Sequence, residues 1–153
     1  MPYERLLVEA AQQGVYTYEK PLHPRTKGLY ADNIVWINRN LSTSVEKHCI
    51  LAEELGHYHT SSGNILDQAD IRNRKQERTA RAWAYEKLVP LASIVQAHRQ
   101  AIRNRHELAD HLSVTEDFLD EAIKHYIEKY GIYIKYENLH ICFEPLGVLE
   151  MLE

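Results

Sequence analysis

Apolar positions in the first part of the chain recur at helical spacing and then at strand spacing. Pro2 and Gly14 bound a predicted helix over 3–13, because proline suits a helix start and glycine a helix end. A short strand is predicted over 15–19. Residues 29–38 are rich in β-branched and aromatic side chains on both sides of a central turn, which predicts a β-hairpin.

The rest of the chain is mostly helical in pattern. A helix opened by one of the N-cap candidates at 42–44 is expected to run to about His59, with a break at 61–64. Further helices are predicted over 73–88, 91–103 and 116–129, and a closing β-hairpin over 132–136 and 139–143. With no convincing linker or repeat, the pattern predicts one α+β domain over 1–153.

Composition adds limits to this picture. The chain has 44% hydrophobic and 26% charged residues and a net charge of −4, which is ordinary for a soluble globular protein. The N-terminus lacks the basic and apolar segments of a signal peptide. No stretch approaches the roughly 20 apolar residues of a membrane span. A cytoplasmic protein with no membrane partner is therefore expected.

Residues 53–57, Glu-Glu-Leu-Gly-His, have the form of the zinc-peptidase signature H-E-x-x-H with Glu in place of the first His. Residues four apart share one face of a helix, so Glu53 and His57 can ligate the same ion. Glu54, between them, has the position of the general base. Gly56 costs a helix interior about 1 kcal/mol, which predicts that another backbone packs against it.

A catalytic zinc has three protein ligands, so a further one must come from elsewhere. The helix over 73–88 offers Glu77. The alternative is that Glu53 and Glu54 form an acidic patch on a solvated helix and that His57 is a surface residue. For the pentapeptide alone, the acidic patch is favoured. The second helix reverses this preference and favours a metal-site scaffold.

The two helices together resemble the ImmA/IrrE family of metallo-endopeptidases. That family pairs the motif A-H-E-L-G-H with a second motif, E-x-x-A-N-x-F-A-x-x-L-L-M-P. Residues 52–57 match the first, with Glu53 at the position of the first His, and Arg81 replaces the Asn of the second. The second motif is matched by Glu77, Ala80, Trp83, Ala84, Leu88 and Pro90.

The resemblance extends over residues 3–130 and implies a zincin-like helical core around a metal-site helix pair. By this resemblance Glu54 is the catalytic base, and His57 and Glu77 are metal ligands with Glu53 as the variant third. A zinc ion held by two Glu and one His is formally neutral, so weaker and more alkaline activity is expected than with two His. The oxygen ligands also shift the preference toward Mn²⁺ or Fe²⁺, although zinc stays a strong competitor.

The resemblance also implies a partner. Members of the family on phages and mobile elements are paired with a helix-turn-helix repressor that they cleave or inactivate. A cytoplasmic repressor is therefore the expected protein substrate. The alternative from the same fold is a catalytically weak or inactive adaptor that binds the repressor.

Residues 104–130 resemble a helix-turn-helix segment, so a DNA-binding regulator is a third hypothesis. Its second helix carries four carboxylates that would repel phosphates, at Glu116, Asp117, Asp120 and Glu121. We therefore expect this segment to be a packing or protein-docking element. The net charge of −4 likewise argues against direct nucleic-acid binding.

Overall fold

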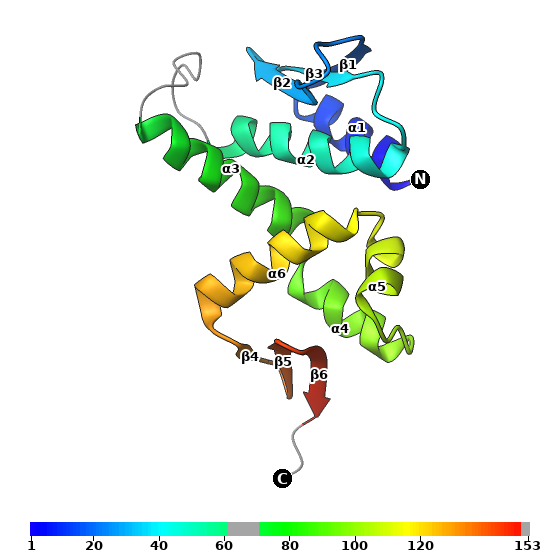
Figure 1. Ribbon diagram of the computed structural model, residues 1–153, viewed down its shortest axis with the longest axis vertical. Helices are drawn as coiled ribbons and strands as arrows, with labels where there is room; N and C mark the ends of the chain where they lie inside the picture. The colour runs from blue at the N-terminus through cyan, green and yellow to red at the C-terminus, as the bar shows by residue number, and fades with distance from the viewer. Residues whose placement is uncertain (61–70, 151–153) are drawn as a thin grey trace. The chain divides into compact units, whose positions relative to one another are not determined.

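The structure is a computed structural model that describes residues 1–60 and 71–150 (Figure 1). The predicted break at 61–64 lies outside the described residues. The chain divides into two compact units, Met1–Ala84 and Tyr85–Glu153, whose boundary falls within helix α3 (Ile71–Leu88). Each unit combines helices with a three-stranded sheet, which confirms the predicted α+β class. The single domain over 1–153 stays a prediction.

The first unit opens with helix α1 (Pro2–Gln12) and a small mixed sheet. Strands β1 (Tyr16–Lys20), β2 (Gly28–Ala31) and β3 (Ile34–Asn38) are ordered β1-β3-β2. β1 runs parallel to β3, and β2 runs antiparallel to it. The predicted hairpin is confirmed as β2–β3, with its turn at Asp32 and Asn33, whose φ angles are 50° and 65°. Asp and Asn tolerate this left-handed backbone better than most residues.

One face of this sheet is buried against α1 and helix α2 (Ser44–Thr60), as Figure 1 shows. Val35 and Ile37 of β3 point into that layer and are fully buried, together with Leu51 of α2. The alternation of strand side chains sends Tyr18 and Trp36 to the other face, where their rings lie 5.3 Å apart. The core of this unit therefore lies between the sheet and the two helices.

Helices α2 and α3 approach closely at Gly56. A methyl group added at Gly56 would lie 2.2 Å from the carbonyl oxygen of Ala80 and 2.8 Å from its carbonyl carbon. Only glycine allows this approach, because backbone atoms cannot move aside as a flexible side chain can. The prediction that another backbone packs against Gly56 is confirmed, and this contact joins the two helices that carry the candidate site.

The second unit contains helices α4 (Leu91–Arg99), α5 (Arg105–Leu112) and α6 (Glu116–Tyr130). They are followed by an antiparallel sheet in the order β4-β5-β6, formed by Tyr133–Tyr136, Leu139–Phe143 and Leu146–Glu150. The predicted hairpin is confirmed as β4–β5, and β6 was not predicted. The predicted helix over 91–103 is too long, because the chain leaves the helix after Arg99 and Ala101 takes a left-handed φ of 64°.

The helix-turn-helix-like segment folds as α5, a turn and α6. Ser113 takes the left-handed conformation at the end of α5, and the Thr115 side chain caps α6 by accepting a hydrogen bond from the Phe118 amide. The apolar face of α6 is buried, with Leu119 and Ile123 almost inaccessible. This burial gives α6 the expected packing role. Among the described residues, no helix is long and apolar enough to cross a membrane.

Candidate metal centre

Three of the four predicted site residues lie on α2, and the fourth lies on α3. Glu53, Glu54 and His57 occupy the last three turns of α2, and Glu77 lies in α3 near the Gly56 contact. The imidazole Nε2 of His57 is 2.9 Å from Oε2 of Glu77. The His57 side chain is 8% exposed and that of Glu77 is 37% exposed. The helix pair therefore brings the predicted ligands His57 and Glu77 into direct contact.

Glu54 lies between α2 and the strand β2. A methyl group added at Gly28 would lie 3.1 Å from Cγ of Glu54 and 3.3 Å from its Oε1, so a larger residue at 28 would crowd this carboxyl group. Burial raises the pKa of Glu54 to about 7 and is partly opposed by the positive charge of His57. A carboxyl group with a pKa near neutrality can both accept and return a proton at neutral pH.

The charges around His57 favour an ion pair with Glu77. Burial alone would lower the pKa of His57, but the hydrogen bond and charge of Glu77, with the charges of Glu54 and Glu53, raise it. The hydrogen bond from His57 lowers the pKa of Glu77 against the effect of burial. Burial also raises the pKa of Glu53. The Glu77 carboxylate, with smaller contributions from Glu54 and Glu53, thus favours the positively charged form of His57.

A second basic side chain reaches Glu77. The Nε of Arg81 lies 3.4 Å from Oε1 of Glu77, one helical turn away, so basic groups contact both carboxylate oxygens. From the sequence, Arg81 is expected as a departure from the family motif and as part of a basic run on a solvated helix face, and not as a partner of Glu77. Its spacing of four residues from Glu77 was the signal for this ion pair. Gly28 was also missed, and nothing in its local sequence marks it as a neighbour of Glu54.

The donor atoms fit part of a metal centre. Two ligands of one tetrahedral zinc ion lie about 3.3 Å apart when each is about 2.0 Å from the ion, so the 2.9 Å between His57 and Glu77 is close to the required spacing. His57 Nδ1 is buried and has no hydrogen-bond partner within 1–60 and 71–150. Over the same ranges, no three His, Cys, Asp or Glu side chains are grouped closely enough to hold an ion. His57 and Glu77 are therefore spaced nearly as two ligands of one ion would be. Glu53 as the third ligand stays a prediction.

The comparison with known proteins bears on this helix pair. A family profile described as the IrrE N-terminal-like domain, a peptidase family, matches residues 1–124, which include the whole of α2 and α3. Searches of curated proteins and of solved structures gave no significant match. The family match covers most of the 153 residues and contains every predicted site residue. The chain therefore belongs to the IrrE N-terminal-like family of metallopeptidases, as its paired motifs predicted.

Proposed function

We propose that the chain is a metal-dependent endopeptidase in which His57 and Glu77 hold the metal, with Glu53 as third ligand and Glu54 as general base. The observation that carries this proposal is the 2.9 Å contact between His57 and Glu77 across two helices. Zinc is the favoured ion for a site with an imidazole ligand, and Mn²⁺ or Fe²⁺ are candidates because the other ligands are oxygens.

The protein groups have separate tasks in peptide hydrolysis. A bound metal would supply Lewis-acid polarisation of the scissile carbonyl. Glu54 would take a proton from the attacking water and return it to the amine that leaves when the peptide bond breaks. Its carboxyl group lies beside Gly28 and interacts electrostatically with both His57 and Glu77, so it is close to the groups that would hold the metal.

The strand next to Glu54 supports a peptide as substrate. Within the described residues, β2 pairs with β3 on one side only, so its other edge presents unpaired backbone groups. An extended chain bound along that edge would pass Gly28 and therefore the Glu54 carboxyl group. Such binding selects an unfolded or loop segment of a protein over a small molecule.

The substrate we propose is a cytoplasmic helix-turn-helix repressor of a phage or mobile element, as expected from the family resemblance. The test is co-expression with the repressor encoded nearest the gene, followed by detection of repressor fragments. Wild type should cleave, and Glu54→Gln should cleave at least about 100-fold more slowly because the general base is lost. Glu128→Gln, which changes an exposed carboxylate on α6, is the matched control and should cleave normally. Equal cleavage by Glu54→Gln and wild type would contradict the proposed base.

A second candidate is a non-catalytic adaptor, and the Arg81–Glu77 contact favours it. Arg81 adds a positive charge where a metal would need the Glu77 carboxylate, and Glu53 replaces an imidazole ligand. An adaptor would bind the intact repressor in a complex that survives both a chelator and Glu54→Gln. Fragments that appear with wild type and disappear with Glu54→Gln would exclude it.

A further inference from the structure

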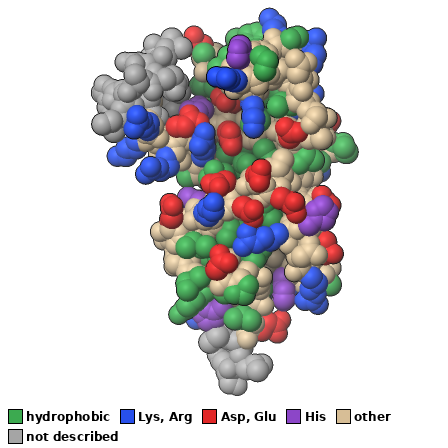
Figure 2. All heavy atoms as spheres, in the orientation of Figure 1, with side chains coloured by type: hydrophobic (Ala, Val, Ile, Leu, Met, Phe, Trp, Pro, Cys, Tyr) green, Lys and Arg blue, Asp and Glu red, His purple; other side chains and the backbone are tan. Residues whose placement is uncertain are grey.

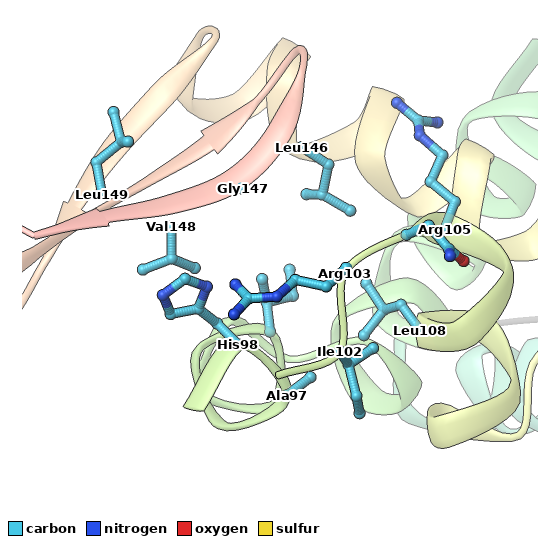
Figure 3. Close-up of a pocket in the computed structure, with 12 residues that line it drawn as sticks. Ala97, His98, Ile102, Arg103, Arg105, Leu108, Leu146, Gly147, Val148 and Leu149 are labelled. Carbon is cyan, nitrogen blue, oxygen red and sulfur yellow. The ribbon is translucent and has the colours of Figure 1, made fainter. Parts of the chain in front are cut away.

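A groove of about 470 Å³ lies wholly within the second unit (Figure 3). One side is formed by α4, the following loop and the start of α5, and the other by strand β6. Its floor is apolar, since Ile94, Leu108 and Val148 are each at most 8% exposed. Strand β6 begins after residue 124, so the groove includes a part of the chain beyond the family match.

The rim of the groove is basic. His98, Arg103 and Arg105 line it, and no acidic residue is among its described lining residues. Arg105 is engaged by Asp120, with 2.6 Å between Nη1 and Oδ1. Arg103 and His98 have no ion-pair partner in the part of the chain that the structure describes, and Figure 3 shows both side chains at the groove. The guanidinium charge of Arg103 is therefore available to an acidic ligand.

The groove follows the edge of β6 and not just one of its faces. Four consecutive residues of the strand, 146–149, line it, although successive strand side chains point to opposite faces. In Figure 3, Val148 points into the groove and Leu149 points away from it. Among the described residues β6 pairs only with β5, so its outer backbone edge is open to another strand.

From these features we propose that the groove binds an extended segment of a partner protein that carries apolar and acidic side chains together on one face, at every second position. The segment would add to the edge of β6 through main-chain hydrogen bonds. On that face, its apolar side chains would lie over Leu108 and Val148, and its carboxylate would meet the Arg103 guanidinium and the His98 imidazole. This surface would hold a partner whether or not the chain cleaves it, so it does not depend on the metal centre.

The probe is a capped seven-residue peptide, here called the valine–glutamate peptide, with valine at positions 2 and 6, glutamate at position 4 and threonine elsewhere, so that valine and glutamate share one face. It is titrated into the full chain at physiological salt. Amide signals of Gly147 and Leu149 in a ¹⁵N NMR spectrum report binding along β6. A valine–lysine peptide, with lysine in place of the glutamate, should bind at least about tenfold more weakly, because its lysine meets the Arg103 guanidinium with like charge. An N-methylated valine–glutamate peptide should also lose binding, because it cannot donate the main-chain hydrogen bonds.

Two variants test the location. Arg103→Glu and Gly147→Glu should each weaken binding of the valine–glutamate peptide by about tenfold or more. Gly147→Glu is suited to the test because a Cβ at Gly147 meets nothing within 4 Å, so the fold should tolerate this substitution. Arg99→Glu changes an exposed residue of α4 outside the groove and is the control, with binding expected within about twofold of wild type.

Three results would overturn the proposal. The first is equal binding of the valine–lysine and valine–glutamate peptides. The second is unchanged affinity in both groove variants while thermal unfolding shows that they are folded. The third is a shift of the Gly147 and Leu149 amides with protein concentration and no peptide, which would assign the edge to a second copy of the chain.

Discussion

Glu77 contacts two basic side chains, and the balance between them decides whether its carboxylate is available to a metal. His57 Nε2 approaches one oxygen at 2.9 Å and Arg81 Nε approaches the other at 3.4 Å. The imidazole is a metal ligand when neutral, whereas the guanidinium never is. Arg81 is about half exposed, so its contact with Glu77 costs little to break.

Arg81→Asn should therefore strengthen metal binding. Removing the positive charge beside Glu77 should tighten the zinc dissociation constant by roughly tenfold, which corresponds to about 1.4 kcal/mol. Calorimetric titration of the chelator-treated protein measures it. Arg78→Asn, an exposed position of the same helix, is the control and should change the constant by less than about twofold. Weaker zinc binding by Arg81→Asn than by wild type would show that Arg81 supports the site.

At the residue scale, helical spacing and the paired motifs were enough to predict that His57 and Glu77 meet. They did not predict the surroundings of these two residues. The contact between Glu54 and Gly28 depends on how the sheet sits on α2, which is set by core packing over residues far apart in the chain. The direction of the Glu53 side chain depends on its rotamer, which a local sequence pattern does not encode.

At the scale of elements, the close approach of α2 and α3 holds the candidate site together. Gly56→Ala would raise intrinsic helix propensity by about 1 kcal/mol, yet its methyl group would meet the Ala80 carbonyl at 2.2 Å. We expect the free energy of unfolding to fall by about 1–3 kcal/mol, because the Ala80 backbone can move away from the added methyl group only if the two helices separate. Urea denaturation measures it.

The matched control is Gly147→Ala, since a Cβ at that position meets nothing within 4 Å. Its free energy of unfolding should lie within about 0.5 kcal/mol of wild type. A Gly56→Ala protein as stable as wild type would refute the close approach of α2 and α3.

A second inter-element contact links β1 to α2 and α1. Glu19 Oε1 accepts from Lys47 Nζ at 2.7 Å, and Glu19 Oε2 accepts from the Tyr3 hydroxyl at 2.9 Å. The hydrogen bond from Lys47, opposed by burial and aided by Tyr3, lowers the pKa of Glu19. A carboxyl group with a lowered pKa stabilises the fold above its unfolded pKa of about 4.3, and this stabilisation is lost as the pH falls through the folded value.

Glu19→Gln should therefore cost about 0.5–1 kcal/mol at pH 7, a small figure because the Glu19 side chain is 34% exposed. The difference from wild type should shrink as the pH falls below the unfolded pKa of about 4.3 and through the lowered folded value, because the wild-type carboxyl group then becomes protonated. Chemical denaturation at pH 7 and pH 3.5 measures both values. The exposed Glu128→Gln should show no such pH-dependent difference, and a cost for Glu19→Gln that stays constant between the two pH values would rule out the charge contribution.

Most elements followed from the sequence because their signals are local. Proline at the start of α1, the Asp32–Asn33 turn and the N-cap of α6 each fix a boundary within a few residues. Two boundaries had no such signal. After α4 the chain takes a left-handed conformation at Ala101, and alanine is not a residue that predicts this conformation. Strand β6 follows Pro145 and contains Gly147, and both residues are more typical of turns than of strands.

At the scale of the whole molecule, the family match and the compact units have different boundaries. The match over 1–124 crosses the division at Ala84 and ends within α6, so it covers the first unit, helices α4 and α5 and the first part of α6. Figure 2 shows acidic and basic side chains interleaved over the visible face. This distribution and the net charge of −4 agree with the expectation that the chain binds a protein and not a nucleic acid. The protein partner stays a prediction.

The metal content of the purified protein tests the central claim most directly. Elemental analysis after expression in metal-replete medium should find about one ion per chain in wild type and in Glu54→Gln, because the base is not a ligand. His57→Ala and Glu77→Ala should each lose it, since each removes one of the two donors in contact. A wild-type protein that never holds stoichiometric metal, or a Glu77→Ala protein that retains it, would contradict the account.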